Sequence, residues 1–303
     1  MKCLKCLLPL SLSAGPYGLH SECFVAWFKA EDNARFISLT RRSSHSYDGV
    51  SKSAPQNTSF FHGKFKKYSA ELDGGSYILK MREADAPELP EVEYLCNQIG
   101  KLFEIPVAEF YIINFDEHQE DKVFVTKNFI RPNTPTDLQH IYHFRSNTDH
   151  SCEGLIRTIT EKTKRPYDIE IFIKTILFDA LIGNHDRHGR NLALVTTSGD
   201  TSLSPIYDNV SYLSLEKGNM LKADFNPAGK ISTQTTYEPS MCDYVKELKR
   251  LGYKENIEQF YSKAGFSKIA KLIQESFCSE LMKEALKRLI NKRYMELENE
   301  LRS

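Results

Sequence analysis

The sequence lacks an excess of charge of either sign, a long apolar run and an internal repeat. Lysine and arginine together number 40 in 303 residues, and aspartate and glutamate also number 40. This neutral balance gives no sign of a nucleic-acid or membrane-surface partner. No run of about 18 apolar residues occurs, so we expect no membrane-spanning helix. The hydrophobic share of 41% is ordinary for a globular chain and indicates one or two domains with a real core.

The sequence also lacks an even set of cysteines and a clear signal peptide. Seven cysteines are an odd number in a chain too long to need disulfides, which favours a reducing compartment. The start, MKCLKCLLPLSLSAGPYG, carries Lys2 and Lys5 before an apolar patch. Pro9 interrupts that patch and no A-x-A cleavage site follows, so we expect this start to be mature chain.

Apolar patterning predicts a β-rich first half and a helical second half. In the first half we expect one helix at 87–103 and four strands, within 65–72, 75–80, 107–115 and 122–130. The second half begins with an almost wholly apolar helix at 168–183, with Asp168 as its N-cap and Gly183 as its C-cap. Two short strands about a Ser-Gly-Asp turn follow within 192–208, and amphipathic helices fill 255–301.

This order of elements predicts an α+β fold of two lobes with a cleft between them. The expected divisions are a small N-terminal segment at 1–40, a β-rich N-lobe at 41–131 and a larger helical C-lobe at 132–303. Residues 41–59 are polar and serine-rich, so we expect a loop or linker there.

The polar stretch GNHDRHGRN, residues 183–191, directly follows the apolar helix. It contains Asp186 and Asn191, and Asp208 closes the expected hairpin in PIYDNVS. Phosphoryl transfer needs one carboxylate to accept the proton of the attacking hydroxyl, and an amide with a second carboxylate to hold Mg²⁺. Protein kinases space an Asp, an Asn and a metal-binding Asp in this way. The alternative is a polar loop whose Asp and Asn only cap neighbouring turns.

Two further residues fit the same chemistry. Lys80 ends the strand-like SYILK, as the phosphate-binding lysine of a kinase does. Glu93 lies in the first turns of the helix expected at 87–103, where it can face that lysine. Taken singly, these are an ordinary surface lysine and a helix-start carboxylate. Their order along the chain, before Asp186 and Asn191, is much more specific than any one of them.

The motifs GNHDRHGRNLALV, SPIYDNVSYL, YILKM and PEVEY together resemble the HipA/HipT family of bacterial serine/threonine kinases, the toxins of toxin–antitoxin systems. The resemblance implies the two-lobed kinase-like fold, ATP and Mg²⁺. It implies that Asp186 is the catalytic base and that Asn191 and Asp208 hold the metal. It further implies that Lys80 contacts the phosphates and Glu93 orients Lys80. His188 fills the position of the family's loop histidine, for which we expect a structural or substrate-positioning role.

The phosphate loop departs from the family pattern. In FFHGKFKK, Gly63 and Lys67 match the pattern, whereas Phe65 replaces its glutamine and Phe60 and His62 replace its serines. We expect ATP binding to survive, because backbone N–H groups cradle phosphates whatever the side chain. The family phosphorylates serines of this loop, so we expect autophosphorylation to move to a neighbouring hydroxyl. The candidates are Ser51, Ser53, Thr58 and Ser59.

Four residues near the start have the spacing of zinc ligands. Cys3-x2-Cys6 is followed by His20-x2-Cys23, two close pairs of soft ligands that suit tetrahedral Zn²⁺. In this start the chain also resembles some HipA-like proteins, which begin with a similar C-x2-C and H-x2-C pair. The alternative is that Cys3 and Cys6 are small buried hydrophobes. The other cysteines are isolated, and we expect each of them to be buried: Cys96, Cys152, Cys242 and Cys278.

The leading hypothesis is an ATP-dependent kinase that phosphorylates a Ser or Thr of a protein. The resemblance implies that this substrate is often an aminoacyl-tRNA synthetase. The charge balance predicts no direct nucleic-acid contact. The resemblance implies antitoxin proteins as partners, and we expect the protein in the bacterial cytoplasm or, as a secreted effector, in a host cell. A phosphoinositide-type lipid kinase is an alternative, but the lysines of 209–230 form no basic cluster. A nucleotide-binding pseudokinase scaffold is a third, although a scaffold has no need for Lys80, Asp186, Asn191 and Asp208.

Overall fold

The computed structural model describes residues 2–10, 15–42, 67–115, 121–130, 135–144, 150–189, 191–216, 219–223 and 229–303. The chain forms two compact units. Unit 1 comprises Met1–Tyr94 and Ala108–Phe129, and unit 2 comprises Leu95–Val107 and Ile130–Ser303. The second half of one helix, α2 (Leu89–Leu102), therefore belongs to unit 2.

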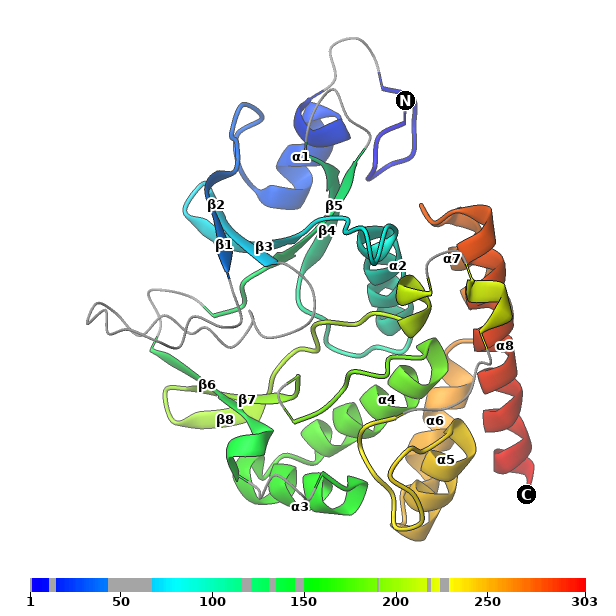
Figure 1. Cartoon of the computed structure of the whole chain (residues 1–303). Coiled ribbons are helices and arrows are strands. Elements are labelled where there is room, and N and C mark those ends of the chain that lie inside the picture. Colours follow the sequence, from blue (N-terminus) through cyan, green and yellow to red (C-terminus); the bar gives the residue numbers. More distant parts are fainter. Residues whose placement is uncertain are drawn as a thin grey trace. The chain divides into compact units, whose positions relative to one another are not determined.

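Unit 1 is built on an antiparallel sheet in the order β1-β2-β3-β5-β4 (Figure 1). The strands are β1 (Ile37–Arg42), β2 (Lys67–Leu72), β3 (Gly75–Lys80), β4 (Phe110–Asn114) and β5 (Lys122–Lys127). The four predicted strands are confirmed, and β1 was not predicted. Asp73 and Gly74 connect β2 to β3 with φ of 47° and 72°, which is the positive-φ turn that closes a two-residue hairpin. This hairpin sets Lys67 opposite Lys80.

The two faces of this sheet carry different elements of unit 1. Side chains alternate along a strand, so Tyr77 and Lys80 point to opposite faces. On one face, Phe28 of α1 (Ser21–Phe28) lies 4.5 Å from Tyr111 and 5.9 Å from Tyr77, between ring centroids. On the other face, Glu93 of α2 contacts Lys80. The sequence signals had not predicted α1 or the short helix η1 (Pro16–Gly18) before it.

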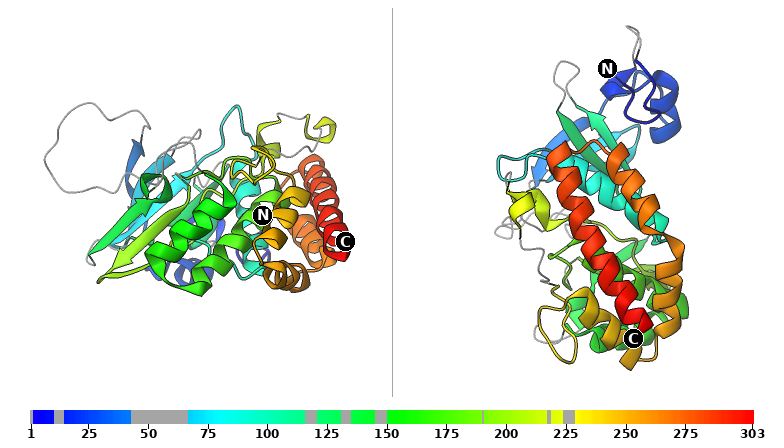
Figure 2. Two further views of the ribbon diagram at one scale, coloured as in Figure 1. Left: turned by 90° about the horizontal axis from the view of Figure 1, so that it is seen from below. Right: turned by 90° about the vertical axis from the view of Figure 1, so that its right-hand side faces the viewer.

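Unit 2 is mainly helical, and α4 (Pro166–Ile182) is its central helix (Figures 1 and 2). Around it lie α3 (Cys152–Thr163), α5 (Met241–Arg250), α6 (Lys254–Lys263) and α8 (Glu280–Arg302). The helix α7 (Phe266–Glu275) packs on α8. Because α4 is apolar on nearly every side, it can be buried on every side, as predicted. The helix α3 was not predicted.

The ends of α4 confirm one predicted cap and correct the other. Asp168 lies inside the helix, and the N-cap is Arg165, because Pro166 occupies the first helical position where no N–H is needed. Gly183 is the C-cap with φ of 69°, as predicted. A Cβ at Gly183 would come within 2.8 Å of Leu289, so space and backbone conformation both require glycine there.

A second antiparallel sheet in unit 2 has the order β6-β7-β8. Its strands are β6 (Thr136–His140), β7 (Ala193–Thr197) and β8 (Asp200–Leu203), and unit 2 also contains the short helices η3 (Ile141–Phe144), η4 (Tyr212–Leu215) and η5 (Met220–Lys222). The predicted hairpin β7–β8 is confirmed, with Ser198 and Gly199 at positive φ in its turn. The strand β6 was not predicted.

All seven cysteines are free, and burial follows the prediction except at one of them. Cys96, Cys152 and Cys278 are buried, whereas Cys242 is only half buried. It lies on the first turn of α5. Among the described residues, none of the helices is both long enough and apolar enough to span a membrane.

Candidate active site

The loop that carries Asp186 begins where α4 ends at Gly183. Its side chains hold its own backbone: Asn184 Oδ1 accepts from the Asp186 N–H at 3.1 Å, and Asn191 Nδ2 donates to the Asp186 carbonyl at 2.8 Å. These two hydrogen bonds use the backbone of Asp186 and not its carboxylate. That carboxylate is 68% exposed. The loop therefore presents Asp186 to solvent, as a residue that meets a substrate hydroxyl requires.

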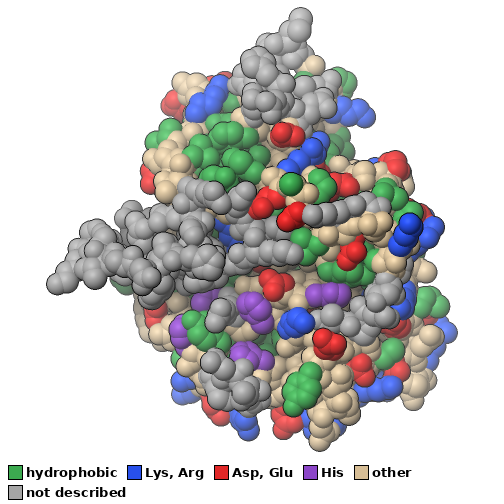
Figure 3. Space-filling model, viewed as in Figure 1, with side chains coloured by type: hydrophobic (Ala, Val, Ile, Leu, Met, Phe, Trp, Pro, Cys, Tyr) green, Lys and Arg blue, Asp and Glu red, His purple; other side chains and the backbone are tan. Residues whose placement is uncertain are grey.

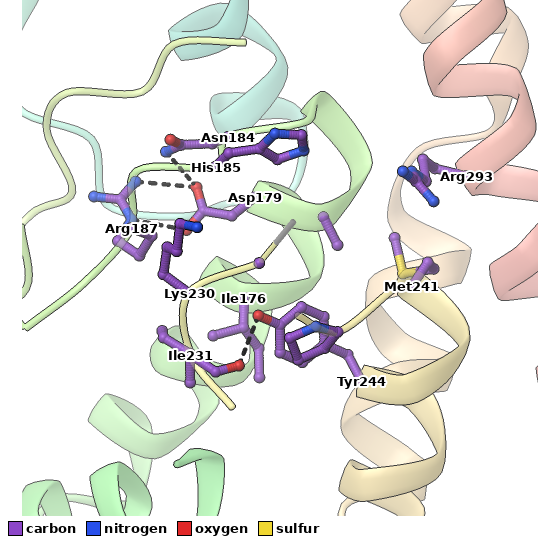
Figure 4. A pocket seen from close by; sticks show the side chains of 13 residues that line it. Ile176, Asp179, Asn184, His185, Arg187, Lys230, Ile231, Met241, Tyr244 and Arg293 are labelled. Carbon is purple, nitrogen blue, oxygen red and sulfur yellow. Dashed lines mark hydrogen bonds and ion pairs between the residues drawn. The ribbon is translucent and has the colours of Figure 1, made fainter. Parts of the chain in front are cut away.

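Arg187, next to Asp186, points the opposite way and is buried. It binds Asp179 of α4 with both ends of its guanidinium, Nε to Oδ2 at 2.7 Å and Nη2 to Oδ1 at 3.1 Å (Figure 4). Its Nη1 donates to two carbonyls, that of Asn191 at 3.0 Å and that of Tyr207 at 2.9 Å. One nitrogen thus brings together the backbone of Asn191 and the residue before Asp208.

The same guanidinium reaches a second amide. Arg187 Nη2 donates to Asn209 Oδ1 at 2.5 Å, and Asn209 Nδ2 donates to Asn97 Oδ1 at 2.9 Å. Asn97 lies in the part of α2 that belongs to unit 2. We call Asp179, Arg187 and Asn209, with the carbonyls of Asn191 and Tyr207, the Arg187 network.

Burial opposes both charges of the central ion pair. It raises the pKa of the Asp179 carboxyl, which Arg187 and Asn184 counteract. Burial also works to lower the pKa of Arg187, but the facing Asp179 carboxylate outweighs it and raises that pKa. Because the contact is bidentate and each nitrogen of the guanidinium has an acceptor, we take both groups as ionised.

Asp208 has the left-handed conformation, with φ of 56°. Its neighbours are tied to fixed points of unit 2: Ile206 N–H donates to the Pro106 carbonyl at 2.8 Å, and Tyr212 N–H to the Gly183 carbonyl at 2.9 Å. Aspartate tolerates this conformation better than most residues. The segment is thus anchored on both sides of a half-buried carboxylate.

A small cavity lies beside this loop, within unit 2 (Figure 4). Its lining includes Asp179, Arg187, Lys230 and Tyr244 but not Asp186. The cavity therefore lies on the side of the Arg187 network, away from the exposed carboxylate.

His188 is about two fifths exposed, and its Nε2 lies 3.6 Å from Asp186 Oδ1. Unit 2 contains further histidines close in sequence to the loop or to strand β6, and histidine side chains gather on the face shown in Figure 3. The backbone also ties this region to the loop, since Tyr142 N–H donates to the Gly189 carbonyl at 3.2 Å. The surroundings of Asp186 within unit 2 therefore include imidazole side chains.

Lys80 and Glu93 form an ion pair within unit 1. The Nζ of Lys80 lies 2.5 Å from Oε1 of Glu93, and both side chains are almost fully buried. The ammonium also lies 5.7 Å from the centre of the Phe124 ring. Lys67, opposite Lys80 in the sheet, is only 2% exposed. Glu93 therefore faces Lys80, as the sequence predicted.

The remaining predicted residues of the phosphate loop lie outside the described residues. These are Gly63 and the autophosphorylation candidates Ser51, Ser53, Thr58 and Ser59.

The four predicted zinc ligands come together in unit 1. The ligand atoms of Cys3, Cys6, His20 and Cys23 all lie within 4.8 Å of one another. Burial raises the pKa of the Cys3 thiol, but hydrogen bonds from the backbone of Cys6, His20 and Lys5 lower it to about 7. Burial, with the neighbouring thiols, raises the pKa of Cys23 to about 12.

Sequence reasoning missed the Arg187 network. A signal was present: Asp179 is the one charged residue in the apolar last turns of α4, and a buried acid there requires a cationic or hydrogen-bonding partner. An arginine in the loop that follows was the nearest such partner. Asn97 and Asn209 carried no comparable signal, because they are far apart in the sequence.

Comparisons with known proteins identify the family of this chain. The model of the HipA-like C-terminal domain matches residues 50–265. A curated relative named "Putative kinase Y4dM", from Sinorhizobium fredii, is 28% identical over 170 residues, which cover 49% of this chain. The match spans only 40% of that relative's length.

Two solved structures share the fold. The Helicobacter pylori proinflammatory kinase CtkA has a TM-score of 0.62 at 18% identity, over 78% of this chain and 93% of CtkA. HipA of a Shewanella oneidensis MR-1 toxin–antitoxin system, solved with HipB and operator DNA, has a TM-score of 0.57 at 16% identity. That match covers 88% of this chain and 71% of HipA. At identities this low, the structural matches establish the fold alone. It is the kinase-like α+β fold that the sequence predicted.

Proposed function

Because this chain belongs to the HipA-like C-terminal domain family, we propose that it is an ATP-dependent kinase that phosphorylates a protein Ser or Thr hydroxyl. The observation that carries the proposal is the Arg187 network. One guanidinium nitrogen binds the carbonyls of Asn191 and Tyr207 and so ties the backbone at Asn191 to the residue before Asp208. A loop needed only to cap turns has no use for such a buried, fully bonded arginine.

In this proposal Asp186 accepts the proton of the acceptor hydroxyl. The hydroxyl oxygen bonds to the γ-phosphorus as the bond from that phosphorus to the bridging oxygen breaks, so that ADP leaves. Lys80 balances charge on the phosphates, and Glu93 holds its ammonium in place. His188, beside the Asp186 carboxylate, helps to position the acceptor.

Asn191 and Asp208 suit Mg²⁺ by their chemistry. Asn191 uses its Nδ2 on the Asp186 carbonyl, so its amide oxygen is the atom left to face a metal. An amide oxygen and a carboxylate are the hard oxygen donors that Mg²⁺ takes with substrate phosphates. When bound, Mg²⁺ neutralises charge on the phosphates and orients them.

We propose residues 41–131 as the N-lobe, 132–303 as the C-lobe and 1–40 as a separate N-terminal segment. A protein substrate fits better than a phosphoinositide, because 209–230 has no basic cluster. From the resemblance to HipA-like proteins we further propose an aminoacyl-tRNA synthetase as the substrate. We also propose an antitoxin protein as a partner, as HipB is for the Shewanella protein. The place of action is the bacterial cytoplasm or, after secretion, a host cell.

The test is incubation of the protein with γ-labelled ATP and, separately, a bacterial lysate, a host-cell lysate and phosphoinositide vesicles. We expect label on Ser or Thr of a protein, with none from Asp186→Asn. Label on lipid alone would support a lipid kinase. Nucleotide binding with no transfer to any acceptor would show a scaffold.

We also predict autophosphorylation within residues 51–59, at Ser51, Ser53, Thr58 or Ser59. A phosphate there adds about −1.5 to −2 charge close in sequence to Lys64 and Lys66 of the phosphate loop, and should lower ATP affinity. Intact-mass measurement of wild type incubated with Mg·ATP should show steps of about 80 Da per phosphate. Asp186→Asn is the control and should show none. Unmodified wild type after prolonged incubation would refute the prediction.

A further inference from the structure

The cluster of Cys3, Cys6, His20 and Cys23 has the size of a zinc tetrahedron. Zn–S bonds of about 2.3 Å and Zn–N bonds of about 2.0–2.1 Å place two sulfurs about 3.8 Å apart, and sulfur and nitrogen about 3.6 Å apart. The Nδ1 of His20 lies 3.3 Å from Cys6 Sγ and 4.0 Å from Cys23 Sγ, one on each side of that value. Because all four ligand atoms lie within 4.8 Å of one another, only small shifts separate them from a coordination sphere.

The imidazole of His20 is already oriented for a metal. Its Nε2 lies 3.0 Å from the Pro9 carbonyl, a contact in which Nε2 must carry the proton and donate. Nδ1 then has its lone pair free of a proton, directed toward the two sulfurs. Metal-binding histidines commonly have such a carbonyl partner on the other nitrogen.

The backbone between Cys3 and Cys6 forms a tight turn that brings its two thiols together. Leu7 N–H donates to the Cys3 carbonyl and Cys3 N–H to the Leu8 carbonyl, both at 2.9 Å. Leu7 adopts a positive φ of 63°, which is unfavourable for a leucine unless its surroundings hold it. A second bond, from Leu4 N–H to the Gly18 carbonyl at 3.1 Å, ties this turn to the segment before His20.

We propose that Cys3, Cys6, His20 and Cys23 bind one Zn²⁺ in a closed structural site that holds residues 2–28 on the sheet of unit 1. Four protein ligands complete the tetrahedron and leave no position for water or substrate, so the ion has a structural role. The proposal stands independently of the proposed kinase activity, because it uses none of the same residues.

The aromatic side chains next to the cluster show what the ion would stabilise. Cys23 is followed by Phe24 and Phe28 on α1, and Tyr17 lies between the two ligand pairs in sequence. The Tyr17 ring lies 6.0 Å from that of Phe24, and its hydroxyl accepts from the Phe36 N–H at 2.8 Å. Phe28 in turn contacts Tyr77 of β3, the strand that ends at Lys80. Zinc therefore fixes the layer that covers the face of the sheet opposite to Lys80.

Metal content of the full-length protein tests the site. We expect wild type, purified with added Zn²⁺ and then freed of loose ions, to hold one zinc per chain. Cys6→Ser should lose most of it, and the matched control Cys242→Ser, a half-buried cysteine outside the cluster, should keep it. Wild type without zinc, or equal zinc in both variants, would overturn the proposal.

Cobalt substitution keeps the proposal testable if Cys6→Ser does not fold. Wild type reconstituted with Co²⁺ should show the intense visible bands of a tetrahedral ion and a thiolate charge-transfer band, and Zn²⁺ should abolish both. Octahedral, weakly coloured cobalt would contradict the site. So would a disulfide among Cys3, Cys6 and Cys23 in protein purified without reductant.

Hydrogen exchange tests the structural role. Removing zinc with a chelator should speed exchange in 15–28 and in β3 and β4, whose faces α1 covers, and leave α4 of unit 2 unchanged. Exchange that is unchanged in unit 1 after zinc loss would show that the ion does not hold this layer.

Discussion

Asp186→Asn should reduce phosphoryl transfer by about 10²- to 10⁴-fold, the usual contribution of a positioned general base. The loop should keep its shape, because Asn184 and Asn191 bind the backbone of Asp186 and not its carboxylate. Asparagine has the same shape as aspartate but cannot accept the proton of the acceptor. Affinity for Mg·ATP should therefore stay close to that of wild type. The measurement is single-turnover transfer together with calorimetric titration of ATP.

The matched comparison is Asp208→Asn. It removes a proposed metal ligand and should first weaken the Mg²⁺-dependent part of ATP binding, with loss of transfer following from that. If both variants lost ATP binding with the same Mg²⁺ dependence, Asp186 would be a metal ligand or would be needed for folding. Retained transfer in Asp186→Asn would remove it from the chemistry altogether.

Arg187→Met should have the largest effect on stability of any change in the loop. It leaves the Asp179 carboxylate buried without its cation and removes the donor to the Asn191 and Tyr207 carbonyls. Breaking a buried ion pair from one side costs about 3–5 kcal/mol. Chemical denaturation followed by circular dichroism measures this. Arg288→Met is the control, because Arg288 and its partner Glu284 are both about half exposed and their ion pair should contribute under about 1 kcal/mol.

A double variant separates stability from positioning. Asp179→Leu combined with Arg187→Met replaces the pair by apolar groups, which is often neutral for stability. We expect it to recover much of the free energy of unfolding but little of the transfer rate, because nothing then holds the backbone beside Asn191 and Asp208. The defect should lie in kcat and in Mg²⁺ dependence, more than in KM for the acceptor. Full recovery of activity would show that Arg187 serves stability alone.

The sequence by itself was enough for the parts that depend on local pattern. Strand alternation and helical periodicity predicted β2, β3, β4, β5, α2 and α4, and the polar stretch predicted that Asp186 lies in a loop directly after α4. Gly183 was predictable as a cap because only glycine readily takes positive φ there. Spacing of two residues within each pair predicted that Cys3, Cys6, His20 and Cys23 would meet.

Tertiary structure alone decided the rest. The strands β1 and β6 lie at sheet edges and lack the long apolar pattern of central strands, since neighbours cover them on fewer sides. Asp168 has the residue type of an N-cap, but Pro166 before it starts the helix earlier. The Arg187 network joins residues as distant as Asn97 and Asn209, and hydrogen bonds over that separation leave no periodic trace in a sequence. Which loop arginine neutralises Asp179, and so which backbone groups surround Asp186, depends on the packing of the folded chain.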